Sequence, residues 1–225
     1  MTHVTDSLGQ GDAAVRLVRD ERGLALVGDG MELRGDFSRM LPRLRQGRLQ
    51  QELLVKAARI KGAEAPTAVD CTAGLGEDSL LLAAAGFAVT LFERDQTIAA
   101  LLADALERAA ADPRLAEAVG RMTLVAGNSI AGLAALTEPP DVVYLDPMFP
   151  ARTKSAAVKK KFQLLHHLEQ PCEEEEALVA AALAAQPRKV VIKRPAKGAL
   201  LAGVKPSYSV AGKAVRYDVL VPPRP

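Results

Sequence analysis

The stretch that decides the fold is TAVDCTAGLG, residues 67–76. Its first five residues are mostly apolar and short in extent, so they predict a buried strand. Gly74 and Gly76 follow where this strand turns into a predicted helix over 77–85, and glycine lets the backbone approach a ligand where a Cβ atom would clash. An ordinary tight turn is the alternative for the glycines alone. The stretch therefore predicts an α/β fold with a ligand-binding turn.

An acidic residue follows the next predicted strand. This strand covers 87–92, and Glu93 comes directly after it, nineteen residues past Gly74. A carboxylate at that place commonly accepts hydrogen bonds from a ribose diol, which NAD and S-adenosylmethionine (SAM) both carry. The dinucleotide fingerprint requires a third glycine at position 79, where this chain has Ser79. Because SAM has no pyrophosphate, this difference favours the methyl donor, and an NAD-dependent oxidoreductase is the alternative.

The same alternation of strands and helices continues along the chain. We expect strands near 67–71, 87–92, 122–126, 141–145 and 189–193, and helices near 77–85, 96–111, 129–136 and 174–185. Such alternation implies a parallel sheet with helices on both faces and ligands at the carboxyl ends of the strands. A hairpin pattern over 208–221 then predicts an antiparallel end to the sheet. That ending is typical of class I methyltransferases and atypical of dehydrogenases.

The first 62 residues predict a separate small α+β lobe, a candidate for RNA contact, ahead of a SAM-dependent methyltransferase domain over 63–225. Residues 14–18, 24–27 and 31–37 predict short strands. Residues 49–60 predict an amphipathic helix, which Gly62 closes.

The composition bounds the class of protein. The chain has 225 residues, 49% of them hydrophobic and 25% charged, which suits one α/β domain and a small appendage. It has neither an apolar run long enough to span a membrane nor a basic-then-apolar leader, so we expect a cytoplasmic protein. Cys71 and Cys172 predict no disulfide framework. The adjacent residues His166 and His167 would diverge on a helix, so we expect no metal site.

A second ligand-binding motif is DPMF, residues 146–149, which follows the apolar run 142–145. The motif delivers an acid, a rigid proline and an aromatic ring together at a strand end. The Asp146 carboxylate and a backbone carbonyl can accept hydrogen bonds from an NH2 group, and Phe149 can stack on a flat ring. The alternative is a strand-ending turn with a core phenylalanine.

Positive charge gathers in three segments, although the net charge is only +2. These segments lie within 34–61, 152–161 and 188–217, and the last two contain no carboxylate. Segregated cations favour an anionic polymer such as nucleic acid as a partner. Ordinary solvated surface charge is the alternative for each segment taken alone.

Several stretches closely resemble the RsmJ family, the small-subunit ribosomal RNA guanine-N2 methyltransferases. They are DCTAGLG at 70–76, FER at 92–94, VYLDPMFP at 143–150, VIKRP at 191–195, KSAAVKK at 154–160 and RYD at 216–218. The likeness covers most of the chain from about residue 35 and is weak over the first 30 residues. It implies a Rossmann-like class I methyltransferase sheet. It also implies transfer of one methyl group from SAM to the exocyclic N2 of a guanosine near the 3′ end of 16S (small-subunit) rRNA.

The resemblance, together with the glycine turn, implies which residues bind the cofactor. The set is Asp70, Gly74, Gly76, Glu77, Asp78, Glu93, Arg94, Asn128, Ser129 and Asp146. The chain departs from the family pattern at two of these positions. Glu77 stands where a basic residue is expected, and Asn128 stands where serine is common. We expect backbone contacts at both.

The catalytic residues implied are Asp146, Pro147 and Phe149. Guanine N2 is a poor nucleophile because its lone pair is delocalised into the ring. We expect Asp146 and the Pro147 carbonyl to accept the two N2 hydrogens and aim the nitrogen at the methyl group. Phe149 would stack on the guanine, which must be unpaired or flipped out of its helix. A strong base is unnecessary, since the nitrogen-bound proton becomes acidic once the methyl group arrives.

The expected partner is small-subunit rRNA or the 30S subunit. The residues expected to bind RNA are Arg43, Arg45, Arg48, Lys159, Lys160, Lys193 and Arg194. Two alternatives stay open. One is a methyltransferase acting on another amino group, adenine N6 or a protein glutamine. The other is a non-catalytic RNA-binding protein of ribosome assembly. Only the family likeness selects guanine.

Overall fold

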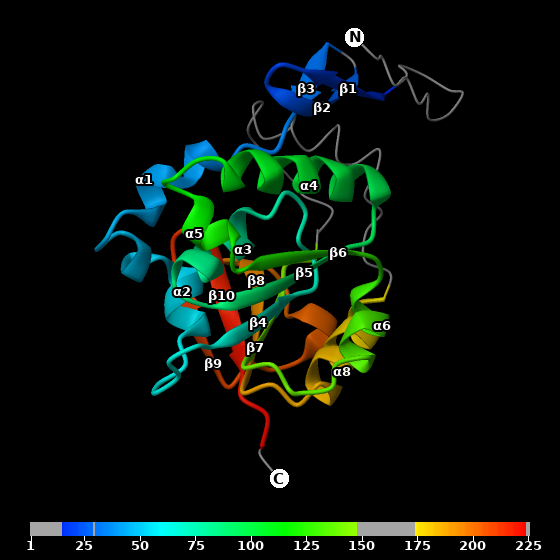
Figure 1. Ribbon diagram of the computed structural model, residues 1–225. Coiled ribbons are helices and arrows are strands. Elements are labelled where there is room, and N and C mark those ends of the chain that lie inside the picture. Colours follow the sequence, from blue (N-terminus) through cyan, green and yellow to red (C-terminus); the bar gives the residue numbers. More distant parts are fainter. Residues whose placement is uncertain (1–14, 29, 148–173, 224–225) are drawn as a thin grey trace.

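The main element of the computed structural model, which describes residues 15–28, 30–147 and 174–223, is a seven-stranded sheet (Figure 1). Its strands are β4 Thr67–Asp70, β5 Ala88–Glu93, β6 Met122–Ala126, β7 Val142–Leu145, β8 Lys189–Pro195, β9 Tyr208–Ala211 and β10 Val215–Leu220. Their order across the sheet is β6-β5-β4-β7-β8-β10-β9. Each strand lies within a few residues of its predicted place.

The five strands β4 to β8 are parallel, and the C-terminal hairpin is antiparallel. β4 lies between β5 and β7, and β8 joins the far side of β7. β10 runs antiparallel to both β8 and β9, and the Gly212 N–H closes the hairpin by donating to the Val215 carbonyl at 2.8 Å. The predicted class I methyltransferase sheet is therefore confirmed.

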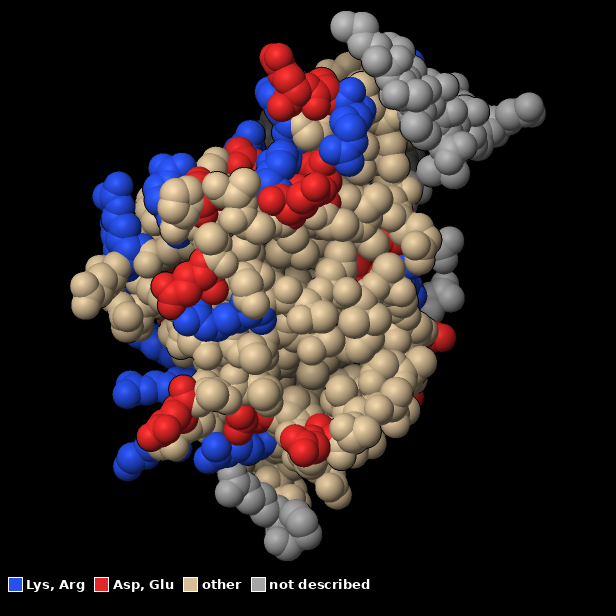
Figure 2. Space-filling view, in the orientation of Figure 1, with Lys and Arg blue, Asp and Glu red and all other residues tan. Residues whose placement is uncertain are grey.

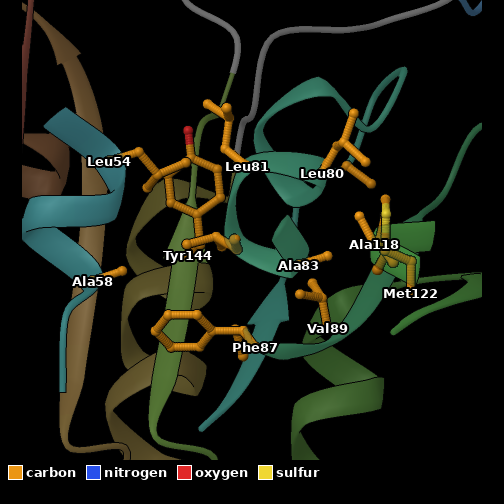
Figure 3. Packing of buried hydrophobic residues seen from close by; sticks show 14 of the residues in the cluster. Leu54, Ala58, Leu80, Leu81, Ala83, Phe87, Val89, Ala118, Met122 and Tyr144 are labelled. Atoms are coloured by element: carbon orange, nitrogen blue, oxygen red, sulfur yellow. The ribbon is translucent and has the colours of Figure 1, made fainter. Parts of the chain in front are cut away.

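Two hydrophobic clusters cover the two faces of this sheet. The face shown in Figure 3 packs against α2 Leu53–Ala58, α3 Glu77–Ala84, α4 Gln96–Ala110 and α5 Ala116–Val119. The other face packs against α6 Ser129–Ala134 and α8 Glu175–Ala184. Successive strand residues alternate between the clusters: Val142 and Tyr144 belong to the first, and Val143 and Leu145 to the second. Strands buried on both faces explain the continuous apolar runs of the sequence.

A small antiparallel sheet of β1 Arg16–Asp20, β2 Gly23–Gly28 and β3 Met31–Leu33 lies over α4 (Figure 1). Leu26 and Leu33 pack there against Ile98 and Leu101 of the helix. The buried Asp104 of α4 also accepts hydrogen bonds from Arg19 of β1 and from Arg108, both at 2.7 Å. An apolar contact and an ion-pair cluster thus hold this sheet on the helix.

The segment between the two sheets differs in detail from the prediction. The third strand ends at Leu33, and η1 Phe37–Met40 begins after Asp36, whose carboxylate accepts from the Ser38 N–H at 3.0 Å. α1 Leu41–Leu44 follows. The single helix expected over 49–60 is instead η2 Leu49–Gln51 and α2, because Glu52 has an extended ψ of 130°.

The predicted boundary at residue 62 stays a prediction. Phe37, Leu49 and Leu54, which lie before it, belong to the same hydrophobic cluster as Leu80 and Tyr144, which lie after it.

Candidate active site

The carboxyl ends of five parallel strands meet at one edge of the sheet. Asp70 ends β4, Glu93 ends β5, and Asn128 follows β6. Asp146 follows β7, and Lys193 lies near the end of β8. Parallel strands bring such residues together because their ends share one edge, which is where open α/β sheets bind ligands.

The two glycines of the turn after β4 have different roles. Both have a positive φ, 53° at Gly74 and 76° at Gly76. A Cβ atom on Gly76 would lie 2.7 Å from Leu102 Cδ1, so this glycine is required for packing. A Cβ atom on Gly74 would meet no atom of the described residues within 4 Å. Gly74 is therefore the glycine whose backbone faces open space and can approach a ligand.

Asp70 stabilises this turn from inside the protein. It is 1% exposed, and its carboxylate accepts from the Ser79 hydroxyl at 2.5 Å and the Thr72 N–H at 3.0 Å. Burial raises the pKa of Asp70 to about 7. The position does not favour direct contact between this carboxylate and a cofactor. Ser79, which replaces the third glycine of the dinucleotide fingerprint, serves as the hydrogen-bond partner of the buried acid.

Glu93 links the second strand end to the glycine turn. Its carboxylate accepts from the Gly74 N–H and the Asp95 N–H, both at 2.9 Å, and burial raises its pKa. A carboxylate has about four acceptor positions, so these two bonds leave capacity for the hydroxyls of a ribose. Arg94, the next residue, is exposed.

Asn128 begins α6 as its N-cap. Its side-chain oxygen accepts from the Ile130 N–H at 2.8 Å. Asparagine and serine are both good N-cap residues, which explains in physical terms how this chain departs from the family pattern without losing the helix start. Ser129 is buried against Cys71, and Glu77 is exposed in the first turn of α3.

Asp146 is tied to the glycine turn through Thr72, which the sequence analysis did not single out. The Asp146 N–H donates to Thr72 Oγ1 at 2.7 Å, and the Cys71 N–H donates to the Tyr144 carbonyl at 3.0 Å. The end of β7 is thereby fixed beside residues 71–76. The two predicted motifs, the glycine turn and the start of the DPMF motif, therefore lie next to one another.

Lys193 joins Asp146 and Asp78. Its Nζ donates to Asp146 Oδ2 at 2.8 Å and to Asp78 Oδ2 at 2.7 Å, and the Tyr144 hydroxyl donates to the same Asp78 oxygen at 2.6 Å. Burial raises the pKa of Asp146, and Lys193 opposes that rise. Burial opposes the charge on Lys193, yet Asp78 and Asp146 raise its pKa above the usual range.

This cluster follows from strand pairing that local sequence patterns do not reveal. Leu145 of β7 pairs with Ile192 of β8, so the next residues along the two strands, Asp146 and Lys193, are neighbours. Lys193 is among the residues predicted to bind RNA, and that role stays a prediction. In the structure its Nζ contacts Asp146, the predicted catalytic acid.

The other residues predicted to bind RNA lie in different environments. Arg45 and Arg48 are exposed, and Figure 2 shows Lys and Arg side chains along the edge of the molecule beside α1 and α2. Arg43 forms two hydrogen bonds with Glu52, at 2.7 and 2.9 Å, and lies within electrostatic range of Asp78. Arg194 is 4% exposed and its Nε donates to the Ala199 carbonyl at 2.7 Å, which does not favour contact with RNA.

Part of the predicted site lies outside the described residues: Phe149, Lys159 and Lys160. Pro147 is described and is buried directly after Asp146. Within 15–28, 30–147 and 174–223, none of the helices is both long and apolar enough to cross a membrane. In the same ranges, His, Cys, Asp and Glu form no group of three that could hold a metal ion.

Comparison with known proteins identifies relatives along almost the whole chain. Residues 9–222 match the model of a family described as SAM-dependent methyltransferase. The chain is 46% identical, over 91% of its length and 84% of the relative, to ribosomal RNA small subunit methyltransferase J of Thioalkalivibrio sulfidiphilus. It is 41% identical to the protein of the same name from Neisseria meningitidis, over 90% of this chain and 82% of that one.

A solved structure shares the fold. The crystal structure of a SAM-dependent methyltransferase from Neisseria gonorrhoeae superposes with a TM-score of 0.77 at 32% sequence identity. The match covers 96% of this chain and 86% of that one.

Proposed function

The chain belongs to the family of SAM-dependent methyltransferases that includes the ribosomal RNA small subunit methyltransferases J, and from this membership we propose that it methylates the exocyclic N2 of a guanosine near the 3′ end of small-subunit rRNA. The observation that carries the proposal is the position of Asp146. Its backbone is hydrogen-bonded to Thr72 of the glycine turn, so an acceptor for an amino group stands beside the expected donor site.

The residues of the turn fit SAM. Gly74 presents its backbone to open space, and Glu93 keeps acceptor capacity for ribose hydroxyls while it orients the Gly74 N–H. Neither feature needs the pyrophosphate that a dinucleotide would bring. When bound, SAM supplies an electrophilic methyl group on a sulfonium.

Asp146 and Pro147 would bind and orient the amino group. The Asp146 carboxylate and the Pro147 carbonyl accept its two hydrogens, which directs the nitrogen lone pair away from the ring and toward the methyl carbon. With SAM bound, the nitrogen–carbon bond would form as the carbon–sulfur bond breaks, and the sulfur would keep the electron pair. The extra proton on nitrogen then passes to Asp146 or to water. No strong base is required in this scheme. Most of the rate enhancement would therefore come from holding the nitrogen in line with the methyl carbon.

RNA would be held beside α1 and η2. Arg45 and Arg48 are exposed there, and Arg43 lies within electrostatic range of Asp78 in the acid–lysine cluster. These exposed arginines would hold the phosphates on either side of an extruded guanosine. Either naked rRNA or an assembled small subunit could be the substrate that meets this surface.

The test is methyl transfer from labelled SAM to two substrates, naked small-subunit rRNA and small subunits purified from cells that lack the enzyme. We expect one methyl group per RNA on the N2 of a single guanosine, located by nuclease digestion and mass spectrometry. The better substrate of the two identifies the form on which the enzyme acts.

Other outcomes select the alternatives. Label on adenine N6 or on a ribosomal protein would replace guanine N2 as the acceptor. RNA binding without any transfer, at saturating SAM, would make the chain a non-catalytic RNA-binding protein.

A further inference from the structure

A lysine bridges two acids at the centre of the site. Lys193 Nζ lies 2.7 Å from Asp78 Oδ2 and 2.8 Å from Asp146 Oδ2. The side chains are 26% exposed at Lys193, 18% at Asp78 and 34% at Asp146, so all three are largely shielded from water. Hydrogen bonds between charged groups are stronger in such an environment than on an open surface.

The bridge is anchored on one side. The Tyr144 hydroxyl donates to the Asp78 oxygen that also accepts from Lys193, so Asp78 is held by both β7 and β8. Lysine has a flexible stem with several rotamers, and an anchored acid limits where its ammonium can lie. The ammonium is thereby kept in contact with Asp146.

We propose that Lys193 is a positioning residue for methyl transfer: held by Asp78 and Tyr144, its ammonium keeps the Asp146 carboxylate ionised and directed toward the amino group that is methylated. The inference rests on the proposed function, since it assigns Lys193 a part in that reaction. It also gives Asp78 a role as the anchor of Lys193.

The ionised form is the better acceptor, because a hydrogen bond to a charged oxygen is stronger than one to a neutral oxygen. A protonated Asp146 would still accept at its carbonyl oxygen, but more weakly, and its other oxygen would carry an O–H donor. Burial favours that neutral form. Lys193 therefore stabilises the state of Asp146 that the reaction uses.

Among the described residues, the charged and titratable groups that act on Asp146 come from five elements. They are Lys193 and Arg194 on β8, Asp78 on α3, Asp70 on β4, Tyr144 on β7 and Tyr217 on β10. The acids disfavour a charge on Asp146, and the tyrosines carry none at neutral pH. Of the two cations, Lys193 forms an ion pair with Asp146 at 2.8 Å, and the Arg194 Nε donates to the Ala199 carbonyl.

The first test measures kcat, and KM for SAM and for the RNA substrate, from pH 5.5 to 9. The variants are Lys193→Gln and Lys193→Arg, with Lys197→Gln as a matched control at an exposed lysine after β8. For Lys193→Gln we expect kcat near neutral pH to fall about tenfold or more and the acidic limb of the profile to move to higher pH. Lys193→Arg keeps the positive charge, so the acidic limb of its pH profile should lie close to that of the wild type.

The second test does not depend on activity. Protein labelled with ¹³C at aspartate carboxyls is titrated by NMR, and the Asp146 signal is assigned from its absence in Asp146→Asn. We expect Asp146 to titrate at a higher pH in Lys193→Gln than in the wild type and in Lys197→Gln. Thermal unfolding of each variant checks that it is folded.

The outcomes separate this inference from the proposed function. An unchanged Asp146 titration in a folded Lys193→Gln protein overturns the inference, as does a rise in KM for SAM with an unmoved pH profile, which would make Lys193 a ligand of the donor. A wild-type protein that transfers no methyl group to small-subunit rRNA overturns the proposed function, and the NMR titration then still decides whether Lys193 controls Asp146.

Discussion

Asp70 shows how a residue predicted to bind a ligand can instead stabilise the turn that binds it. The carboxylate is enclosed by Ser79, Thr72 and the strand, and burial raises its pKa to about 7. At the same strand edge Asp146 keeps a third of its side chain exposed and contacts Lys193. Two aspartates at equivalent strand ends thus differ in role because one is sealed inside the protein and the other faces the site.

The buried Asp70 predicts a specific pH dependence of stability. Its pKa is about 7 in the folded protein, above the ordinary value of 3.8, so folding favours its protonated form. Its contribution to stability is therefore fully present below about pH 4 and is lost as the pH rises through about 7. In Asp70→Asn this loss cannot occur, so the variant should gain stability relative to the wild type over that range. Urea unfolding at several pH values measures the difference, and a constant difference would contradict the assignment.

Replacement of Asp146 should reduce methyl transfer and leave the protein folded. Asp146→Ala removes the acceptor that orients the amino group, so kcat should fall about 100-fold or more. The unfolding temperature should change little, because Lys193 retains its ion pair with Asp78. Asp112→Ala is the matched control, since Asp112 lies on the loop between α4 and α5 and pairs with Arg114. Near-wild-type turnover in Asp146→Ala would contradict the proposed mechanism.

At the scale of elements, the turn from β4 into α3 combines packing and binding in one short segment. Gly76 lies against Leu102 of α4 and Phe37 of η1, so the small N-terminal elements share the packing of this turn. Gly74 lies two residues before it with open space at its Cα. The segment can therefore present its backbone to a ligand while its far end is locked into the core.

Replacement of Gly76 and of Gly74 by alanine should cause two different defects, a loss of stability and a loss of SAM binding. Gly76→Ala should lower the free energy of unfolding by about 1–3 kcal/mol, because its Cβ would lie 2.7 Å from Leu102 Cδ1. Gly74→Ala should cost less stability, since it strains only the backbone, but should weaken SAM binding. Calorimetric titration with SAM and thermal unfolding, done on both variants, separate the two effects. Equal stability losses in the two variants would show that Gly74 is also packed.

Across the whole molecule, the exposed arginines of the proposed basic surface and the active-site acids lie on different elements. Arg45 and Arg48 are exposed beside α1 and η2, whereas Asp78 lies in α3 and Asp146 follows β7. The small β1–β3 sheet is held on α4 by Arg19, Asp104 and Arg108. Substrate binding by this basic surface and chemistry at Asp146 are thus carried by different residues and can be separated by mutation.

Charge reversal on the basic surface should weaken RNA binding and spare SAM binding. We expect Arg45→Glu/Arg48→Glu to lower affinity for small-subunit RNA about tenfold or more at moderate ionic strength, and to flatten the dependence of affinity on salt concentration. Arg114→Glu, at an exposed arginine on the loop between α4 and α5, is the control. Fluorescence anisotropy over a salt series measures both quantities. RNA binding that is indifferent to salt would contradict a phosphate-binding surface.

Local patterns in the amino-acid sequence were sufficient to predict the architecture. Apolar runs such as 142–145 and glycines such as Gly74 are local patterns, and the alternation of strands and helices admits few sheet topologies. The hairpin pattern at 208–221 likewise predicted the antiparallel end of the sheet, which is typical of class I methyltransferases and atypical of dehydrogenases. Local patterns are sufficient to locate these strands, because each strand of a parallel sheet is buried on both faces and is therefore a continuous apolar run in the sequence.

Which side chains meet in the site depends on contacts between strands that local patterns do not reveal. The contact between Lys193 and Asp146 depends on β8 pairing with β7, and Thr72 reaches Asp146 because β4 lies on the other side of β7. The degree of burial likewise distinguishes residues that the sequence pattern treats alike. Asp70 is buried and Asp146 is partly exposed, and Arg194 is buried and Arg45 is exposed. These are contacts between residues far apart in the chain, and their energies come from distance and shielding from water, which residue order alone does not specify.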